Sequence, residues 1–142
     1  MFNYSKDFFG FKELNVKKVI VENCCKHIFV ETTIEAQECP TCGMLAHKVK
    51  GYGKEREIQA MEILGYPSVI HYKPKRLRCE CGKTFSVNSP DIPGRSNLSN
   101  DRKLKIYRDL KLKISMREVA RLNNVSVTYV EYLLDKLNYP LD

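Results

Sequence analysis

The spacing of apolar residues changes once along the chain. From Leu14 to Leu77 apolar and polar positions tend to alternate, which is the period of a half-buried β-strand. Residues 89–94 break this pattern with two prolines and a glycine, and beyond them the apolar spacing becomes three or four residues, the period of an α-helix. The pattern therefore predicts an α+β protein, with a small β-rich domain at residues 1–92 and a helical domain at residues 93–142.

The predicted strands lie between turn-forming residues. Residues 14–34 form a predicted hairpin, broken at 22–26. Alternation is weak in residues 44–58, which contain two glycines, and clear in the strand expected at Ser68–Leu77, which follows a turn at residues 65–67. A short strand is expected at Thr84–Val87.

Three helices are predicted after the break. The first begins near residues 99–101 and the second covers Ser115–Leu122, while the third starts at Ser126, a favoured N-cap residue. The residues expected to face the helical core are Leu104, Tyr107, Leu110 and Ile114 on the first helix, and Val130, Leu133, Leu134 and Leu137 on the third.

Six cysteines suggest a metal site, because thiols in a reducing cytosol bind metals more often than they form structural disulfides. Four of them form two pairs, each followed by a glycine: Cys39 and Cys42, then Cys79 and Cys81. The 36 residues between the pairs are mostly predicted strands, which could fold back and bring the pairs together. We therefore predict a zinc ribbon that binds one structural Zn²⁺ through four thiolates.

Other interpretations of the cysteines remain open. The second pair has one residue between its cysteines, where two are common, and His47 or His71 could replace a ligand. A thioredoxin-like redox role of the first pair would need a long helix after it, and a glycine-broken stretch follows instead. The remaining two cysteines, Cys24 and Cys25, are expected in the hairpin turn without a chemical role.

Charge points toward an anionic partner. The chain carries 24 basic and 17 acidic residues, a net charge of +7, and the excess lies beyond residue 38. Such a balance attracts nucleic acid, an anionic membrane or an acidic protein. We find no apolar run long enough to span a membrane, no basic amphipathic helix and no secretory signal, so we expect no membrane partner and a cytoplasmic location.

Residues 115–130 have the pattern of a helix-turn-helix. Ala120 is small where two helices would cross, Asn124 tolerates the positive φ that the turn needs, and Val125 would fill the corner. The third helix would present Ser126, Val127, Thr128, Tyr129 and Tyr132 to the major groove of DNA. An ordinary three-helix bundle is the alternative, and the acidic residues Glu131 and Asp135 on the third helix favour it.

Taken together, these motifs resemble the N-terminal part of ISL3-family insertion-sequence transposases. The resemblance rests on the order Cys39-Pro-Thr-Cys-Gly, Lys50-Gly-Tyr, Gly65-Tyr-Pro, Lys75-Arg-Leu-Arg, Cys79-Glu-Cys-Gly-Lys-Thr-Phe and the helix-turn-helix, and it extends from about Leu14 to Leu137. Two departures are the shortened second cysteine pair and Asn123-Asn124, where Leu-Gly is usual. The resemblance implies a zinc ribbon and a helix-turn-helix that together bind transposon ends.

The implied partner is double-stranded DNA. We expect the contacts to come from the basic end of the predicted strand, from the second helix and from the third helix: Lys73, Lys75, Arg76, Arg78, Arg117, Arg121, Ser126, Val127, Thr128, Tyr129 and Tyr132. A second copy of the chain or an intact transposase is the expected protein partner. The competing interpretation is a transposase-derived transcriptional regulator or a zinc-stabilised protein-interaction module.

We expect no catalysis by this chain. The family's DDE-type catalytic domain would begin near Asp142, and the acidic residues Asp101, Asp109, Glu118, Glu131 and Asp135 fall at expected solvent positions of the predicted helices. They offer no set that could hold two divalent ions for strand cleavage. Three origins remain open, namely a fragment, a truncated reading frame and a free-standing DNA-binding derivative.

Overall fold

The computed structural model describes residues 10–94 and 96–138, the last two of these as backbone only. The described chain contains nine strands followed by three helices and forms two compact units, Met1–Ser99 and Asn100–Asp142. The predicted α+β class is confirmed.

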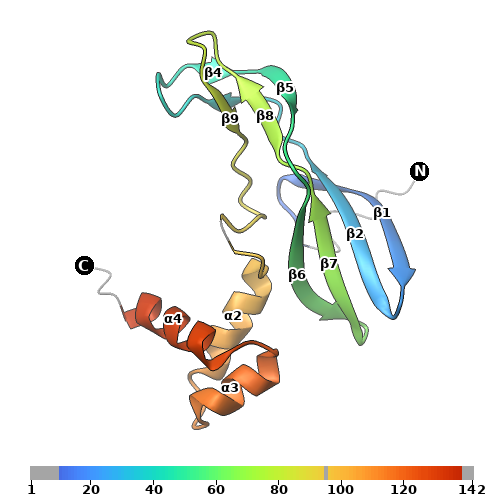
Figure 1. Cartoon of the computed structure of the whole chain (residues 1–142), viewed down its shortest axis with the longest axis vertical. Helices are drawn as coiled ribbons and strands as arrows, with labels where there is room; N and C mark the ends of the chain where they lie inside the picture. The colour runs from blue at the N-terminus through green and yellow to red at the C-terminus, as the bar shows by residue number, and fades with distance from the viewer. Residues whose placement is uncertain (1–9, 95, 139–142) are drawn as a thin grey trace. The chain divides into compact units, whose positions relative to one another are not determined.

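Four strands form the larger sheet of the first unit: β1 (Leu14–Glu22), β2 (Cys25–Thr32), β6 (Arg56–Ile63) and β7 (Tyr66–Tyr72). Their order is β1-β2-β7-β6, with β2 and β7 parallel and the other neighbours antiparallel (Figure 1). One face buries an apolar cluster that includes Leu14, Ile28, Ile58 and Ile70. The other face therefore carries the alternate residues of each strand.

Both hairpins of this sheet close through two residues with positive φ. Asn23 and Cys24 have φ values of 51° and 60°, and Leu64 and Gly65 have values of 51° and 81°. Two successive positive φ angles are typical of the tight turns whose twist matches that of paired strands. The predicted hairpin at residues 14–34 is confirmed, and Cys24 lies in its turn.

The strand predicted at Ser68–Leu77 is two strands in two sheets. β7 ends at Tyr72, and β8 (Lys75–Arg78) begins after Pro74 and pairs elsewhere. Proline has no N–H to donate to a ladder, so it separates the two strands. The Pro74 carbonyl accepts a hydrogen bond of 2.7 Å from the Gly53 amide, at the point where the neighbouring chain also passes from one sheet to the other.

The two smaller sheets of this unit carry the two cysteine pairs in their loops. β3 (Gln37–Glu38) pairs with β4 (Leu45–Ala46), and a second sheet has the order β5-β8-β9. In that sheet β5 covers Lys48–Tyr52 and β9 covers Thr84–Ser86. Leu77 is fully buried in a small core with Ala46, Val87 and the first cysteine of each pair.

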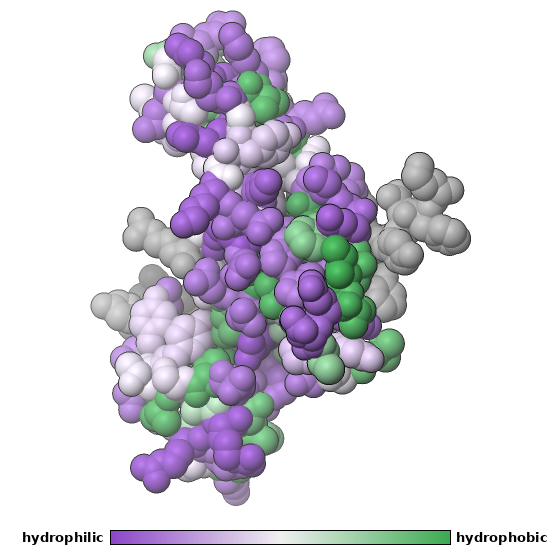
Figure 2. Space-filling model, turned by 45° about the vertical axis from the view of Figure 1, so that its right-hand side comes forward, coloured by the Kyte–Doolittle hydropathy of each residue, from purple (hydrophilic) through white to green (hydrophobic). Residues whose placement is uncertain are grey.

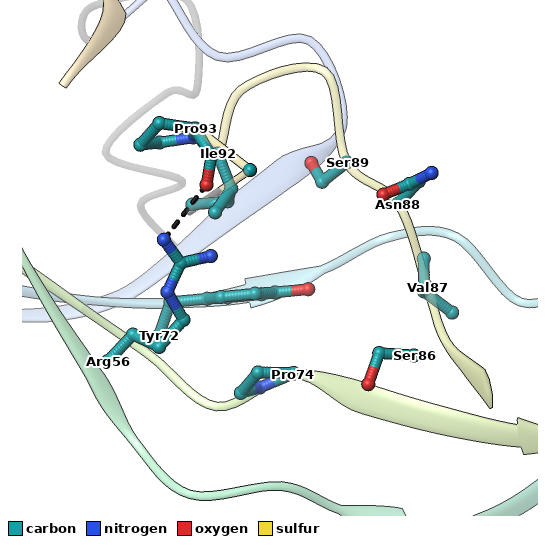
Figure 3. A pocket seen from close by; sticks show the side chains of 10 residues that line it. Arg56, Tyr72, Pro74, Ser86, Val87, Asn88, Ser89, Ile92 and Pro93 are labelled. Carbon is teal, nitrogen blue, oxygen red and sulfur yellow. Dashed lines mark hydrogen bonds between the residues drawn. The ribbon is translucent and has the colours of Figure 1, made fainter. Parts of the chain in front are cut away.

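Hydrogen bonds attach residues 93, 96, 97 and 99 to β6. Arg56 donates hydrogen bonds of 2.9 Å to the carbonyls of Pro93 and Ser96, while Gln59 exchanges backbone hydrogen bonds with Asn97 and Ser99. Figure 3 shows Arg56 beside Tyr72, whose hydroxyl points into a pocket bordered by residues 86–89. Burial raises the pKa of Tyr72, and its hydroxyl has no hydrogen-bond partner among the described residues.

The second unit contains α2 (Asn100–Asp109), α3 (Met116–Asn123) and α4 (Val127–Asn138) (Figure 1). Its core includes Ile106, Val119, Val130 and Leu133, each at most 2% exposed. The Oγ atoms of Ser115 and Ser126 accept hydrogen bonds of 3.1 Å from the backbone amides of Glu118 and Tyr129, which caps the N-termini of α3 and α4.

The predicted core face of the first helix is wrong at Leu104 and Ile114, whereas Tyr107 and Leu110 are half-buried. Leu104 and Ile114 are 48% and 39% exposed, whereas Ile106 is fully buried. Because α2 ends at Asp109, Ile114 does not belong to it. Leu137, expected on the core side of the third helix, has a side chain outside the described residues.

Asn123 and Asp109 join α2 to α3. The buried Asn123 side chain donates a 2.8 Å hydrogen bond to Asp109, and Lys105 lies 2.8 Å from the same carboxylate oxygen. The hydrogen bond from Lys105, followed by that from Asn123, lowers the pKa of Asp109. Asp109 is thus part of a polar network within the helical unit, which corrects its expected solvent position.

Asn124 ends α3 with a φ of 53°, as the turn requires. We expect Asn124→Ala to lower the free energy of unfolding by about 1 kcal/mol, because the left-handed conformation costs a Cβ-bearing residue without a local hydrogen bond about 1–2 kcal/mol. Asn124→Gly is the matched control and should be neutral or stabilising. Urea unfolding followed by circular dichroism measures the stability of both variants. An equal loss of stability in the two would mean that the positive φ at this position is not what Asn124 contributes.

Candidate metal centre and basic surfaces

Each cysteine pair lies in the loop of a hairpin. The Cys39 amide donates to the Met44 carbonyl at 2.8 Å, which closes the β3–β4 loop. The Cys79 amide donates to the Lys83 carbonyl at 2.9 Å, which closes the β8–β9 loop. Gly43 and Gly82 have φ values of 76° and 95°, a region that disfavours residues with a Cβ. The two hairpins thus turn back directly after presenting their thiols.

The four sulfurs lie together. The Sγ atoms of Cys39 and Cys81 are 3.7 Å apart, those of Cys42 and Cys79 are 3.3 Å apart, and all four lie within 4.8 Å of one another. A zinc–sulfur bond of about 2.3 Å places the sulfurs of a tetrahedral site about 3.8 Å apart. These spacings are far longer than the roughly 2 Å of a disulfide. The donor set fits one structural Zn²⁺, as the sequence predicted.

The shortened second pair is accommodated in its hairpin loop. In the first loop the Gly43 amide donates to the Cys39 carbonyl, four residues back, at 2.9 Å. In the second the Gly82 amide donates to the Cys79 carbonyl, three residues back, also at 2.9 Å. The missing residue therefore tightens the turn by one position, and the Cys81 sulfur still reaches the cluster.

Backbone amides favour the thiolate of Cys39. The Cys42 amide, followed by the Thr41 amide at 3.4 Å from the sulfur, lowers the Cys39 pKa to about 6. At Cys79 the amide of Cys81 lowers the pKa, but the neighbouring Cys42 sulfur and burial outweigh it and raise the pKa overall. Coordination by zinc removes this difference, because the metal binds thiolates.

The alternative ligands lie apart from the four-cysteine cluster. His47 is exposed, and among the described residues neither it nor His71 belongs to that group of donor atoms. His71 lies in the four-stranded sheet. Cys24 and Cys25 lie at the β1–β2 turn and likewise contribute no sulfur to the cluster.

The four basic residues expected to bind DNA in the first unit have different surroundings. Arg76 and Arg78 are exposed on β8, on either side of the buried Leu77. Lys73 is exposed in the connection between β7 and β8. The ammonium group of Lys75 instead donates a 3.2 Å hydrogen bond to the Ile34 carbonyl, so it is engaged within the protein.

In the helical unit the expected DNA contacts also differ in exposure. Arg117, Arg121, Ser126, Thr128 and Tyr132 are exposed, whereas Val127 and Tyr129 are half-buried. The guanidinium of Arg121 pairs with both carboxylate oxygens of Glu118, which raises the pKa of Arg121 and lowers that of Glu118. The Tyr129 hydroxyl is buried without a hydrogen-bond partner among the described residues.

Lys48 and Lys50 extend the basic surface and were not identified from the sequence. In the register of β5 and β8, Lys48 lies opposite Arg78, and the irregularity between Val49 and Gly51 contains Lys50. Both lysines are exposed. The weak alternation of residues 44–58 conceals this strand, so only the pairing of β5 with β8 reveals their proximity to the arginines.

Comparison with known proteins identifies the cysteine region. Residues 35–81 match the family described as the zinc-finger of transposase IS204/IS1001/IS1096/IS1165, and no catalytic domain is detected. Searches of curated proteins and of solved structures gave no match. Among the described residues, no helix is both long and apolar enough to cross a membrane. Residues 35–81, with their four clustered cysteines, are therefore a zinc-ribbon domain of the ISL3 transposase family.

Proposed function

We propose that this chain is the zinc-dependent DNA-binding portion of a transposase and that it recognises transposon ends. The observation that carries the proposal is a basic face on the zinc ribbon, formed by Lys48, Arg76 and Arg78. The family of the ribbon supplies the biological setting, because it is a family of transposase zinc fingers.

This basic face results from strand register. Arg78 pairs with Lys48 on one side and Thr84 on the other, and Arg76 pairs with Gly51 and Ser86. Paired residues share a face of a sheet, so these side chains project opposite to Leu77 and the metal core. The face thus combines cations and hydroxyls, the groups that bind phosphate oxygens. Figure 2 shows that the visible surface of the lobe formed by β4, β5, β8 and β9, at the top, is largely hydrophilic.

The helical unit is the proposed second contact. α3, the turn at Asn124 and α4 have the order of a helix-turn-helix, and α4 has no acidic residue in its first turn. Exposed Ser126 and Thr128 at that end of α4 are suited to reach base edges in the major groove. Arg117 is the stronger candidate for a phosphate contact on α3, because Arg121 is paired with Glu118.

One observation favours a protein partner for the helical unit. Leu104, Leu112 and Leu122 are 48%, 56% and 48% exposed. The acidic Glu131 and Asp135 are exposed on α4 and would repel phosphates. The alternative function is therefore a protein-interaction module or a transcriptional regulator, whose helices contact a second copy of the chain or an intact transposase.

The proposal is tested with labelled transposon-end duplex and an unrelated duplex of equal length. We expect tighter binding to the end duplex, and a binding constant that falls steeply with salt because phosphate contacts release counterions. The same mixtures incubated with Mg²⁺ or Mn²⁺ should show binding without nicking. Salt-insensitive or undetectable binding favours the protein-interaction module, and metal-dependent nicking that is lost on changing an acidic residue would contradict a binding-only role.

A further inference from the structure

A second group of metal-ligand side chains lies on the four-stranded sheet, opposite its apolar core. Glu57 of β6 pairs directly with His71 of β7, and Glu55 lies two residues earlier, just before β6 begins. The three donor atoms lie within 4.8 Å of one another. The His71 side chain is 8% exposed, while Glu55 and Glu57 are 37% and 66% exposed, so the group is open to solvent on the carboxylate side.

Two neighbours fix the His71 ring. The Nδ1 atom of His27 lies 2.8 Å from the Nε2 atom of His71, a good hydrogen-bond distance. The Phe29 ring stacks on the His71 ring at 4.4 Å with an angle of 11° between the planes. The ring therefore has one nitrogen bound to another imidazole and directs its Nδ1 atom toward the two carboxylates.

The distances from His71 Nδ1 to the two carboxylates are compatible with all three side chains binding the same metal ion. This atom lies 3.3 Å from Glu55 Oε2 and 3.9 Å from Glu57 Oε1, both longer than the usual N–H···O hydrogen bond. Metal–nitrogen and metal–oxygen bonds of about 2.1 Å separate the donor atoms of a tetrahedral site by about 3.4 Å. Small rotations of the exposed carboxylates would bring both oxygens to that spacing around one ion.

We propose that Glu55, Glu57 and His71 form a second, solvent-accessible site for a divalent transition-metal ion, with His27 as its outer partner. Two carboxylates balance the charge of the ion, and an imidazole together with carboxylates suits Zn²⁺ better than Ca²⁺ or Mg²⁺. Three protein ligands leave a coordination position for water, unlike the four-thiolate site.

His27 gives this site a specific proton arrangement. When His71 binds metal through Nδ1, its proton resides on Nε2 and is donated to Nδ1 of His27. Without metal, the contact of His71 Nδ1 with Glu55 favours the opposite arrangement, in which His71 donates from Nδ1 to the carboxylate and accepts at Nε2 from His27. Metal binding at His71 Nδ1 is therefore expected to exchange the tautomers of the two rings.

The test uses the full chain with its cysteine site already loaded with one zinc. Calorimetric titration with Zn²⁺ should show a second, weaker equivalent, and imidazole ¹⁵N spectra should show the tautomer change of His71 and His27. Glu55→Gln and Glu57→Gln should each weaken this equivalent at least tenfold, and His27→Phe should weaken it about tenfold. Because both carboxylates are exposed, the two Gln variants should fold normally, which amide spectra check.

Two matched controls locate the second equivalent. Glu62→Gln removes the same charge from an exposed position of β6 and should leave zinc binding unchanged. Cys24→Ser with Cys25→Ser removes the thiols outside the ribbon site and should also leave it unchanged. The proposal is overturned if no second equivalent binds, if it survives both Gln changes at Glu55 and Glu57, or if it disappears with the two serine changes.

Discussion

Removing zinc is expected to unfold the zinc ribbon and leave the helices of the second unit folded. The buried core of the ribbon comprises Cys39, Ala46, Leu77, Cys79 and Val87, so two of its five buried members are themselves cysteines of the metal cluster. Burying a large aliphatic side chain contributes about 1.5–3 kcal/mol, while ordering each residue costs about 1–2 kcal/mol of backbone entropy. So few apolar side chains cannot order residues 35–53 and 73–88 without the metal, whereas β6 and β7 are held by the separate core of the four-stranded sheet.

Structural zinc supplies the missing stability. In zinc-finger peptides its binding contributes about 10–16 kcal/mol at neutral pH, and this energy is folding energy. The helical unit has its own buried residues and no cysteine, so chelation leaves its core intact. Amide NMR spectra before and after chelation measure both effects, with loss of dispersed signals from residues 35–53 and 73–88 and retention of those from α3 and α4.

Matched cysteine substitutions separate zinc binding from other effects. Cys81→Ser should abolish stoichiometric zinc binding or reduce it by several orders of magnitude and unfold the ribbon, because a neutral hydroxyl replaces a thiolate ligand. Cys24→Ser changes another exposed cysteine, outside the cluster, and should leave zinc content and folding unaltered. A metal-free protein with a folded ribbon, or a Cys81→Ser protein with normal zinc content, contradicts the assignment.

The cysteine site was predictable from sequence because its geometry is largely local. Each pair lies in one tight turn, and a glycine with positive φ directly follows each pair. Only the approach of the two turns is a long-range property, and the strand pattern between them anticipated it. Helix ends were predictable for the same reason, since Ser115, Ser126 and Asn124 act on backbone groups within three or four residues.

Long-range pairing limited the rest of the prediction. β6 has an irregular register between Ala60 and Ile63, which disrupts the alternation that would reveal a strand. The hydrogen bonds of residues 97–99 to Gln59 are made by backbone groups and have no sequence signal. Likewise, His27 and His71 are 44 positions apart and meet only because β2 and β7 are parallel neighbours.

Changing both arginines of the basic face should weaken binding to every duplex alike. Hydrogen bonds to charged groups contribute about 1.5–3 kcal/mol each, so Arg76→Ala with Arg78→Ala should lower affinity by about a hundredfold or more. Two lost phosphate contacts should also reduce the slope of log affinity against log salt by about 2. Both side chains are exposed, so the ribbon should remain folded and keep its zinc.

Equal loss of charge elsewhere provides the control for this prediction. Lys17→Ala with Lys18→Ala removes two exposed cations from β1 and should change affinity and salt slope far less. Similar losses in both double variants would mean that net charge, and not the face formed by β5 and β8, determines binding. Fluorescence anisotropy across a salt series measures all of these quantities on the same duplexes.

Thr128→Ala should have a different effect from the arginine changes, because base contacts discriminate sequences whereas phosphate contacts do not. Loss of a base-edge contact near the start of α4 should reduce the preference for the end duplex by about 1–3 kcal/mol and leave the salt slope unchanged. The decisive comparison is the ratio of affinities for end and unrelated duplexes. If the arginine changes alter that ratio while Thr128→Ala does not, the ribbon reads the sequence and the helical unit does not, which reverses the proposed roles.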